Sequence, residues 1–238
     1  MLTRQLVTQW LRAMMWLLCR IDAADLARVP LRGPLIMVSN HINFVEMPVL
    51  YTQLRTRPVA VLAKTETWDN PAMGWLFNTL GGSNAIPVRR GEADKDALRK
   101  ALAKLEDGCI LGLAPEGTRS GNGRLQRGQP GVVLLALHSG APILPVVFYG
   151  GERIWHNLPR VRRTDFHIRV GQPFRLDPGA PRVTRAMRQQ MTDEIMWQMA
   201  ALLPPPYRGV YADLDTATEA FLRFPAGSGS TVRMAYGG

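Results

Sequence analysis

The chain has 238 residues, of which 46% are hydrophobic, and this length and apolar content support one domain with a substantial core. Its two cysteines exclude a disulfide framework and a cysteine-based metal cluster. The formal net charge of +10 indicates an anionic partner, and the absence of any zinc-finger, aromatic–basic or basic-zipper motif ranks nucleic acid below a membrane surface or a phosphorylated substrate.

The first 20 residues combine apolar and basic side chains at helical spacing. Apolar positions recur at Leu2, Leu6, Trp10, Met14 and Leu17. The longest unbroken apolar run is too short to span a bilayer, which needs about 20 residues, and no signal-peptide cleavage site follows it. We therefore expect an amphipathic helix that lies in a membrane interface, packs on the protein's own core, or does both.

Beyond residue 30, short apolar runs alternate with helical patterns. The expected strands are Leu35–Val38, Val59–Ala63, Ala85–Val88, Ile110–Ala114, Ile143–Phe148 and Phe166–Val170. The clearest helical patterns cover residues 94–107, 131–139 and 184–203. This alternation predicts an α/β fold, with a single domain whose mostly parallel central sheet is flanked by helices.

The chain shows no internal repeat and no interdomain linker. Residues 1–30 are assigned to the N-terminal amphipathic membrane-interface helical segment, and residues 31–224 to the domain itself. The remaining residues, 225–238, are rich in glycine and serine and are expected to be poorly ordered.

A histidine and a carboxylate stand five residues apart directly after the first expected strand, in His41-Ile-Asn-Phe-Val-Glu46. Imidazole accepts a proton near neutral pH, and a carboxylate can hold it in one tautomer. Positions five apart on a regular helix diverge by about 140°, so the two side chains meet only if His41 precedes a helix that begins near Glu46. The pair predicts a general base at a strand-to-helix turn, and a purely structural pair is the alternative.

Two more polar segments follow expected strands, where open α/β sheets build their sites. Arg89 and Arg90 leave the strand 85–88, and arginine can hold a phosphate with two parallel hydrogen bonds. The run Glu116-Gly117-Thr118-Arg119 offers an acceptor, a hydroxyl and a planar cation around a tight turn that Gly117 permits. Taken alone, either segment could be ordinary surface charge.

In this order, the segments resemble the glycerolipid acyltransferase superfamily, and within it the lysophosphatidic acid acyltransferase family. Asn40-His41 through Glu46 is similar to that family's first block, His-x4-Asp, and residues 74–90 are similar to the second. Glu116 to Arg119 is similar to the third block, and Ile143-Leu-Pro145 to the fourth. Lys64 falls where the family often carries Ala-Lys-x-Glu. The resemblance spans roughly residues 38–147.

The resemblance implies a role for each matched residue. His41 would be the general base on the acceptor hydroxyl, oriented by Glu46. The implied substrate-binding residues are Asn40, Lys64, Arg89, Arg90, Glu116, Gly117, Thr118 and Arg119. No metal or prosthetic group is implied, and the second substrate would be an acyl thioester, either acyl-CoA or an acyl carrier protein.

Two positions depart from the family pattern. Glu46 stands where aspartate is usual, and Arg89 fills a position that is often acidic. Glutamate is one methylene longer than aspartate and occurs in branches that act on other lipids and glycolipids. The glutamate therefore leaves another lipid or a glycolipid as an alternative acceptor to lysophosphatidic acid.

The expected function is transfer of a fatty acyl group from a thioester to the hydroxyl of a lysophospholipid. The acceptor that the resemblance implies is 1-acyl-glycerol-3-phosphate, which would give phosphatidic acid. The alternatives are the same reaction on another lipid or glycolipid acceptor, and a non-catalytic membrane lipid-binding module that retains the fold. Peripheral or monotopic association with an anionic membrane surface, on its cytoplasmic face, is expected, and no nucleic-acid partner.

Overall fold

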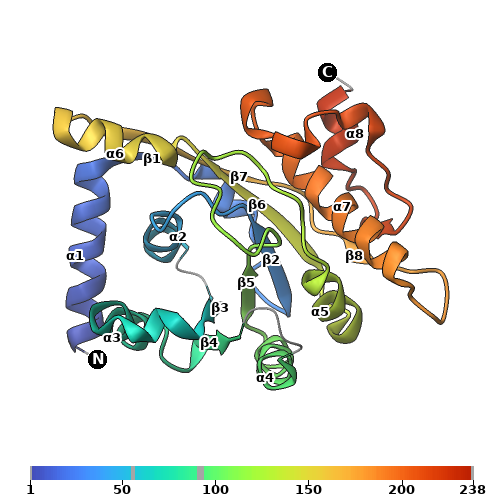
Figure 1. The fold of residues 1–238 in the computed structure, drawn as a ribbon, viewed down its shortest axis with the longest axis horizontal. Helices are drawn as coiled ribbons and strands as arrows, with labels where there is room; N and C mark the ends of the chain where they lie inside the picture. Colours follow the sequence, from blue (N-terminus) through green and yellow to red (C-terminus); the bar gives the residue numbers. More distant parts are fainter. Residues whose placement is uncertain (1, 55–56, 90–93, 237–238) are drawn as a thin grey trace.

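The computed structural model describes residues 2–54, 57–89 and 94–236 of the chain. Within them, seven strands form one sheet in the order β1-β7-β6-β2-β5-β3-β4 (Figure 1). The strands are β1 (Cys19–Asp22), β2 (Leu35–Ser39), β3 (Val59–Lys64), β4 (Ala85–Val88), β5 (Ile110–Leu113), β6 (Ile143–Tyr149) and β7 (Thr164–Val170). Neighbouring strands run parallel except for the antiparallel pair β6 and β7. The predicted α/β fold with a mostly parallel sheet is confirmed.

Helices cover both faces of this sheet. One face carries α4 (Lys95–Glu106), α5 (Gly131–Ser139) and α7 (Arg185–Leu202), and the other carries α1 (Leu2–Leu18) and α2 (Glu46–Gln53) (Figure 1). The remaining α-helices of the described residues are α3 (Pro71–Leu80), α6 (Ile154–Asn157) and α8 (Thr231–Tyr236).

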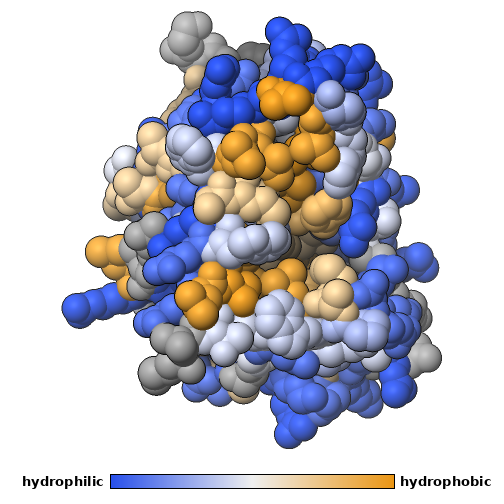
Figure 2. Space-filling model, turned by 90° about the vertical axis from the view of Figure 1, so that its left-hand side faces the viewer, coloured by the Kyte–Doolittle hydropathy of each residue, from blue (hydrophilic) through white to orange (hydrophobic). Residues whose placement is uncertain are grey.

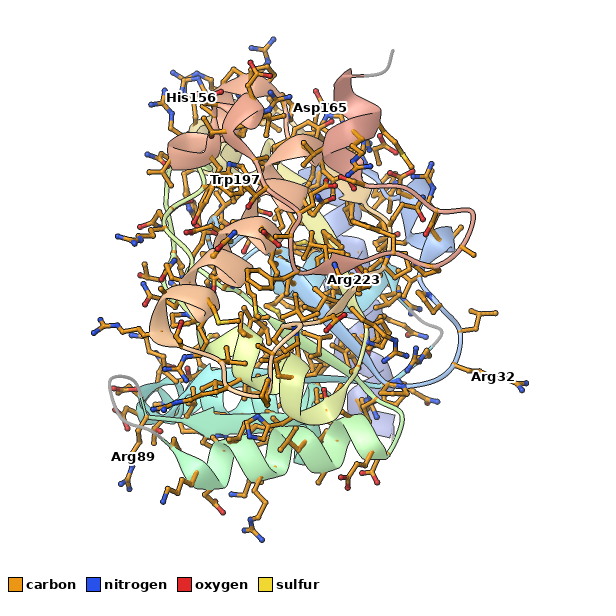
Figure 3. All side chains as sticks on the ribbon, turned by 90° about the vertical axis from the view of Figure 1, so that its right-hand side faces the viewer. Arg32, Arg89, His156, Asp165, Trp197 and Arg223 are labelled. Atoms are coloured by element: carbon orange, nitrogen blue, oxygen red, sulfur yellow. The ribbon has the colours of Figure 1, made fainter. Side chains whose placement is uncertain are left out.

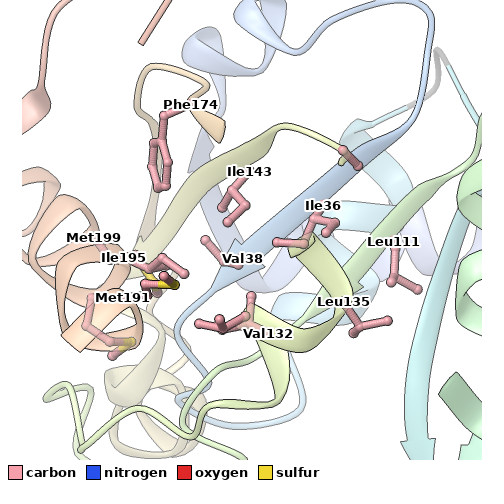
Figure 4. Packing of buried hydrophobic residues seen from close by; sticks show 14 of the residues in the cluster. Ile36, Val38, Leu111, Val132, Leu135, Ile143, Phe174, Met191, Ile195 and Met199 are labelled. Atoms are coloured by element: carbon pink, nitrogen blue, oxygen red, sulfur yellow. The ribbon is translucent and has the colours of Figure 1, made fainter. Parts of the chain in front are cut away.

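The central strands are buried on both faces, which explains why they read as continuous apolar runs. In β2, Ile36 and Val38 belong to the cluster under α5 and α7, whereas Leu35 and Met37 belong to the cluster under α1 and α2. Figure 4 shows the first cluster, in which methionines of α7 approach Ile143 and Val38. Burial on both sides fixes the register of β2, because a slip by one residue would exchange the two faces.

Local signals set the helix ends. The Asp94 side chain accepts a hydrogen bond from the Ala97 N–H and caps α4. Thr184 caps α7 in the same way through the Met187 N–H, and three prolines follow that helix at 204–206. No helix of the described residues is both long enough and apolar enough to cross a bilayer.

The structure corrects two of the predicted boundaries. Cys19–Asp22 is an edge strand of the main sheet, paired with β7, so residues 1–30 are not a separate appendage. Only four residues long and containing two charged side chains, this strand has no pattern that would identify it.

The C-terminal tail, predicted to be poorly ordered, packs on α7 instead. Ser230 is buried, and α8 follows it directly. The Gln198 amide of α7 donates a hydrogen bond to the Ser230 Oγ and accepts one from the Thr231 N–H, at 3.0 and 2.9 Å. These two bonds tie the glycine- and serine-rich segment to the core.

Candidate active site

The strand order brings the predicted site segments to one edge of the sheet. Strands β2, β5, β3 and β4 are parallel neighbours in that order, so their C-terminal ends form a row. His41 follows β2, Glu116 follows β5, and Lys64 is the last residue of β3. Arg89 follows β4, three strand spacings from β2, or roughly 14 Å along the edge.

His41 and Glu46 are in contact. The His41 Nδ1 lies 3.2 Å from the Glu46 Oε2, and Glu46 is the first residue of α2. The other carboxylate oxygen, Oε1, accepts hydrogen bonds from the backbone N–H groups of Ile42 and Asn43, at 3.2 and 2.8 Å. The Glu46 side chain is buried, whereas 26% of the His41 side chain is exposed. This geometry fixes the carboxylate at the positive end of a helix and leaves the His41 Nε2 as the ring nitrogen that can accept a proton.

The Glu116 carboxylate joins this loop to the one that follows β5. Its Oε1 accepts the His41 backbone N–H at 3.0 Å, and its Oε2 accepts the Gln126 N–H at 2.9 Å. The Ser120 N–H in turn donates to the His41 carbonyl at 2.8 Å, and the next N–H donates to the Ile42 carbonyl. The two loops are therefore hydrogen-bonded to each other on both sides of His41.

The Asn40 side chain also forms hydrogen bonds with the backbone. Its Oδ1 accepts the Phe148 N–H and its Nδ2 donates to the Phe148 carbonyl, both at 2.8 Å, and the residue is buried. Both polar groups are buried and paired with backbone groups of the protein, and the direct contact with a substrate that the resemblance implies for Asn40 and Glu116 stays a prediction. Their place in the site is to position the His41 loop.

The other predicted binding residues keep their side chains at the surface. Thr118 and Arg119 are exposed, and Gly117 between them and Glu116 has a φ of +70°, which favours glycine. Lys64 is exposed at the sheet edge, and Arg89 is exposed as well. Figure 3 shows Arg89 at the end of the molecule opposite His156. Arg90 lies outside the described residues.

Asn43 is a site residue that sequence reasoning missed. Its Oδ1 accepts the Val45 N–H at 2.8 Å, and its Nδ2 donates to the Gly151 carbonyl at 3.0 Å. It thereby shapes the turn between His41 and Glu46 and anchors that turn to the segment after β6. An asparagine in the turn before a helix favours an Asx turn, in which its side chain accepts the N–H two residues on, and this signal could have identified it.

Burial raises the pKa of Glu116 to about 7, although its backbone donors and His41 oppose the rise. In the unfolded chain the residue releases its proton near pH 4.5, whereas in the folded protein it keeps it until about pH 7. The folded state binds the extra proton between these values, so the stability contributed by Glu116 falls as the pH rises through this window. The loss amounts to at most about 3 kcal/mol.

Denaturant unfolding of the wild type and Glu116→Gln from pH 4 to pH 8 measures this effect. The wild type should lose stability relative to the variant up to about pH 7, and the difference should then become constant. Glu106→Gln, on the exposed surface of α4, is the matched control. A difference between wild type and Glu116→Gln that does not change with pH would contradict the expectation.

Comparison with known proteins gives one consistent result. A family model described as "Acyltransferase" matches residues 20–149, from β1 to the end of β6. The chain is 31% identical over 144 residues to a 1-acyl-sn-glycerol-3-phosphate acyltransferase of Limnanthes alba, covering 60% of the chain and 50% of that protein. It is 23% identical over 215 residues to one of Pseudomonas aeruginosa, covering 84% and 79%.

The fold has a solved counterpart. The crystal structure of the 1-acyl-sn-glycerophosphate acyltransferase from Thermotoga maritima superposes with a TM-score of 0.57 at 25% identity, covering 81% of the chain and 77% of that protein. The match to a chloroplastic relative from Brassica napus spans only about a third of that relative's length. The family model covers more than half of the chain, including His41, Glu46 and Glu116. The chain belongs to the acyltransferase family of the glycerolipid acyltransferase superfamily.

Proposed function

We propose that the protein is an O-acyltransferase that moves a fatty acyl group from an acyl thioester to the hydroxyl of a lysophospholipid. The single observation that carries this proposal is the contact between His41 Nδ1 and Glu46 Oε2, with the imidazole partly exposed at the edge of the sheet. The names of the relatives support 1-acyl-glycerol-3-phosphate as the acceptor, which would give phosphatidic acid.

The chemistry needs a base because a neutral alcohol is a weak nucleophile. The His41 Nε2 takes the proton of the acceptor hydroxyl as its oxygen bonds to the thioester carbonyl carbon. The carbon–sulfur bond then breaks, and the imidazolium returns its proton to the leaving thiolate. Because Glu46 holds the Nδ1 proton, Nε2 stays available as the acceptor. The thioester is already activated, so we propose no metal and no prosthetic group, and acyl-CoA or an acyl carrier protein as the donor.

Exposed cations along the sheet edge supply the electrostatic match to a phosphorylated headgroup. Lys64, Arg89 and Arg119 are exposed on loops or strand ends of this edge. Of the three, Arg119 is the one next to Ser120, whose N–H donates to the His41 carbonyl, so it lies on the loop that is hydrogen-bonded to the His41 loop. We therefore assign Arg119 the main role in binding the acceptor's phosphate.

Arg119→Ala should raise the KM for the acceptor roughly 10- to 100-fold, because a hydrogen bond to a charged group contributes about 1.5–3 kcal/mol. The kcat should change much less, since Arg119 binds the acceptor away from the reacting hydroxyl. Arg124→Ala, an exposed arginine of the same loop, is the matched control and should leave KM unchanged. An unchanged KM in Arg119→Ala would assign that arginine to the structure of the loop.

A membrane partner follows from the substrate. The acceptor carries a long acyl chain, and α1 exposes tryptophan and leucine side chains next to basic residues. We propose peripheral association with an anionic membrane surface, on the cytoplasmic face, and no nucleic-acid partner.

The direct test is a mass-spectrometric assay of the purified protein with a panel of lysophospholipids and both classes of thioester donor. Formation of phosphatidic acid from 1-acyl-glycerol-3-phosphate is the expected result. Glu46, in place of the usual aspartate, favours one alternative, namely acylation of another lipid or glycolipid, and the panel includes such acceptors. Lipid binding without transfer to any acceptor would instead support a non-catalytic lipid-binding module.

A further inference from the structure

Exposed apolar side chains gather where the C-terminal half of α1 meets the segment Ile154–Arg163. The segment contains α6 and the turn that follows it, and it exposes Trp155, Leu158 and Val161. In α1, Trp10, Trp16 and Leu17 are exposed as well. Figure 1 shows α6 crossing the end of α1, and Figure 2 shows apolar patches on this side of the molecule bordered by hydrophilic residues.

The two segments are in contact through Arg163. The Arg163 guanidinium lies over the Trp16 ring, 5.2 Å from its centroid, and its Nη2 donates to the Cys19 carbonyl at 2.6 Å. An arginine that stacks on an exposed tryptophan keeps the aromatic ring in a fixed orientation. The exposed tryptophan of α1 therefore adjoins the Ile154–Arg163 segment.

Val161 is the unusual residue of this segment. Its φ of +50° and ψ of +38° are left-handed, a conformation that is strained for a β-branched residue, and 95% of its surface is exposed. Two backbone hydrogen bonds hold the turn, from the Val161 N–H to the Leu158 carbonyl and from the Arg162 N–H to the Asn157 carbonyl, both at 3.1 Å. Glycine is the residue that such a turn favours, so folding alone does not explain an exposed valine here.

The same segment contacts the loop that carries the base. Phe44, three residues after His41, lies with its ring centroid 5.5 Å from that of Trp155, and both rings are exposed. The Asn43 side chain donates to the Gly151 carbonyl just before α6. The exposed aromatic surface therefore ends next to the His41 loop.

The charges around the segment select the partner. Arg160 and Arg162 are exposed on it, and Arg153, directly before it, is exposed 3.7 Å from Glu152. Its exposed acidic neighbour Asp165 lies 3.7 Å from Arg20. Tryptophan, leucine and valine beside arginine suit the boundary between lipid headgroups and acyl chains, where apolar side chains enter and cations meet anionic headgroups. A nucleic acid would match the arginines but would leave Val161 and Leu158 without a partner.

We propose that the segment Ile154–Arg163, together with Phe44, is a second membrane-docking element beside α1, and that its occupant is an anionic lipid bilayer. Trp155, Leu158 and Val161 enter the headgroup boundary, and the arginines bind anionic headgroups. The purpose of this element rests on the proposed function. Docking would hold the His41 loop at the membrane surface from which a lipid acceptor arrives.

The test is a fluorescence measurement that needs no turnover. A Val161→Cys variant is labelled with an environment-sensitive fluorophore. Both native cysteines are buried, and burial raises the pKa of the Cys19 thiol to about 11, which favours selective labelling. Met234→Cys is the matched control. Met234 is an exposed residue of α8, at the opposite side of the sheet from α1 (Figure 1).

With vesicles of phosphatidylcholine and phosphatidylglycerol, the label at position 161 should shift to the blue, and the label at position 234 should not. Vesicles of phosphatidylcholine alone should give a smaller shift. A protein that sediments with the vesicles while the label at position 161 stays in water would overturn the proposal, as would a protein that does not sediment. A blue shift without vesicles, growing with protein concentration, would identify a second copy of the chain as the occupant and also overturn it.

Val161→Gly separates docking from folding. Glycine relieves the left-handed strain, so Tm should stay unchanged or rise. Affinity for the mixed vesicles should fall roughly tenfold, because the variant loses an apolar side chain that the bilayer would bury. Unchanged vesicle affinity in this variant would contradict a docking role for Val161. Neither readout depends on acyl transfer, so failure of this proposal and failure of the proposed function are distinguishable.

Discussion

Replacing His41 with alanine should lower kcat by about 10²–10⁴-fold, the range that a positioned general base contributes. The imidazole is the partly exposed member of the pair, and its removal leaves the Glu116, Ser120 and backbone contacts of the loop in place. The folded structure should therefore persist, and the KM for the acceptor should change little. Steady-state kinetics together with thermal unfolding of the same preparation measure both expectations.

His138→Ala is the matched control for this loss. His138 is exposed on α5, and its Nδ1 lies 2.7 Å from the Leu134 carbonyl of the same helix. This variant should keep the wild-type kcat. A His41→Ala protein with wild-type turnover would show that another group removes the hydroxyl proton.

Glu46→Gln should lower kcat nearly as much while preserving the shape of the site. The amide oxygen can still accept the Ile42 and Asn43 N–H groups, but the amide nitrogen then faces the His41 Nδ1. A donor at that position requires Nδ1 to accept and moves the ring proton to Nε2, which removes the base. The corresponding change in serine-hydrolase triads lowers kcat about 10⁴-fold by the same exchange of tautomers.

Glu46→Asp distinguishes the orientation of the base from its charge. The present carboxylate contacts the imidazole with one oxygen and two backbone N–H groups with the other. A side chain shorter by one methylene cannot keep all three contacts unless the loop moves, so we expect this variant to lose activity despite its retained charge. Activity above that of the wild type would mean that the glutamate is a compromise at this position.

The apolar runs and the spacing of the motif were sufficient to predict most strands of the sheet and the contact between His41 and Glu46. Strands buried on both faces leave continuous hydrophobic segments, and the five-residue separation of His41 and Glu46 requires the strand–turn–helix geometry that is observed. The edge strand Cys19–Asp22 and the packing of Ser230 could not be predicted in this way. Both depend on partners far away in the sequence, β7 and Gln198, and neither has a periodic pattern of its own.

The roles of Asn40 and Glu116 were beyond sequence reasoning for a related reason. A polar side chain within a family motif is interpreted as a ligand for the substrate, but its hydrogen-bond partner is decided by tertiary structure. Both side chains bind backbone groups of other segments, over separations of 108 and 75 residues. The left-handed backbone of Val161 is likewise visible only in the structure.

The side chain of Asn40 makes hydrogen bonds that a backbone peptide group would make in a longer strand. In the parallel pairing of β2 with β6, Ser39 is level with Val146, and the chain then turns away. The Asn40 amide supplies both the acceptor and the donor that the Phe148 backbone would otherwise find in a continuation of β2. Asparagine carries both groups on one short side chain. A side chain thus makes the last pair of hydrogen bonds between β2 and β6. The main chain can therefore leave the sheet at His41, and the imidazole lies at the sheet edge.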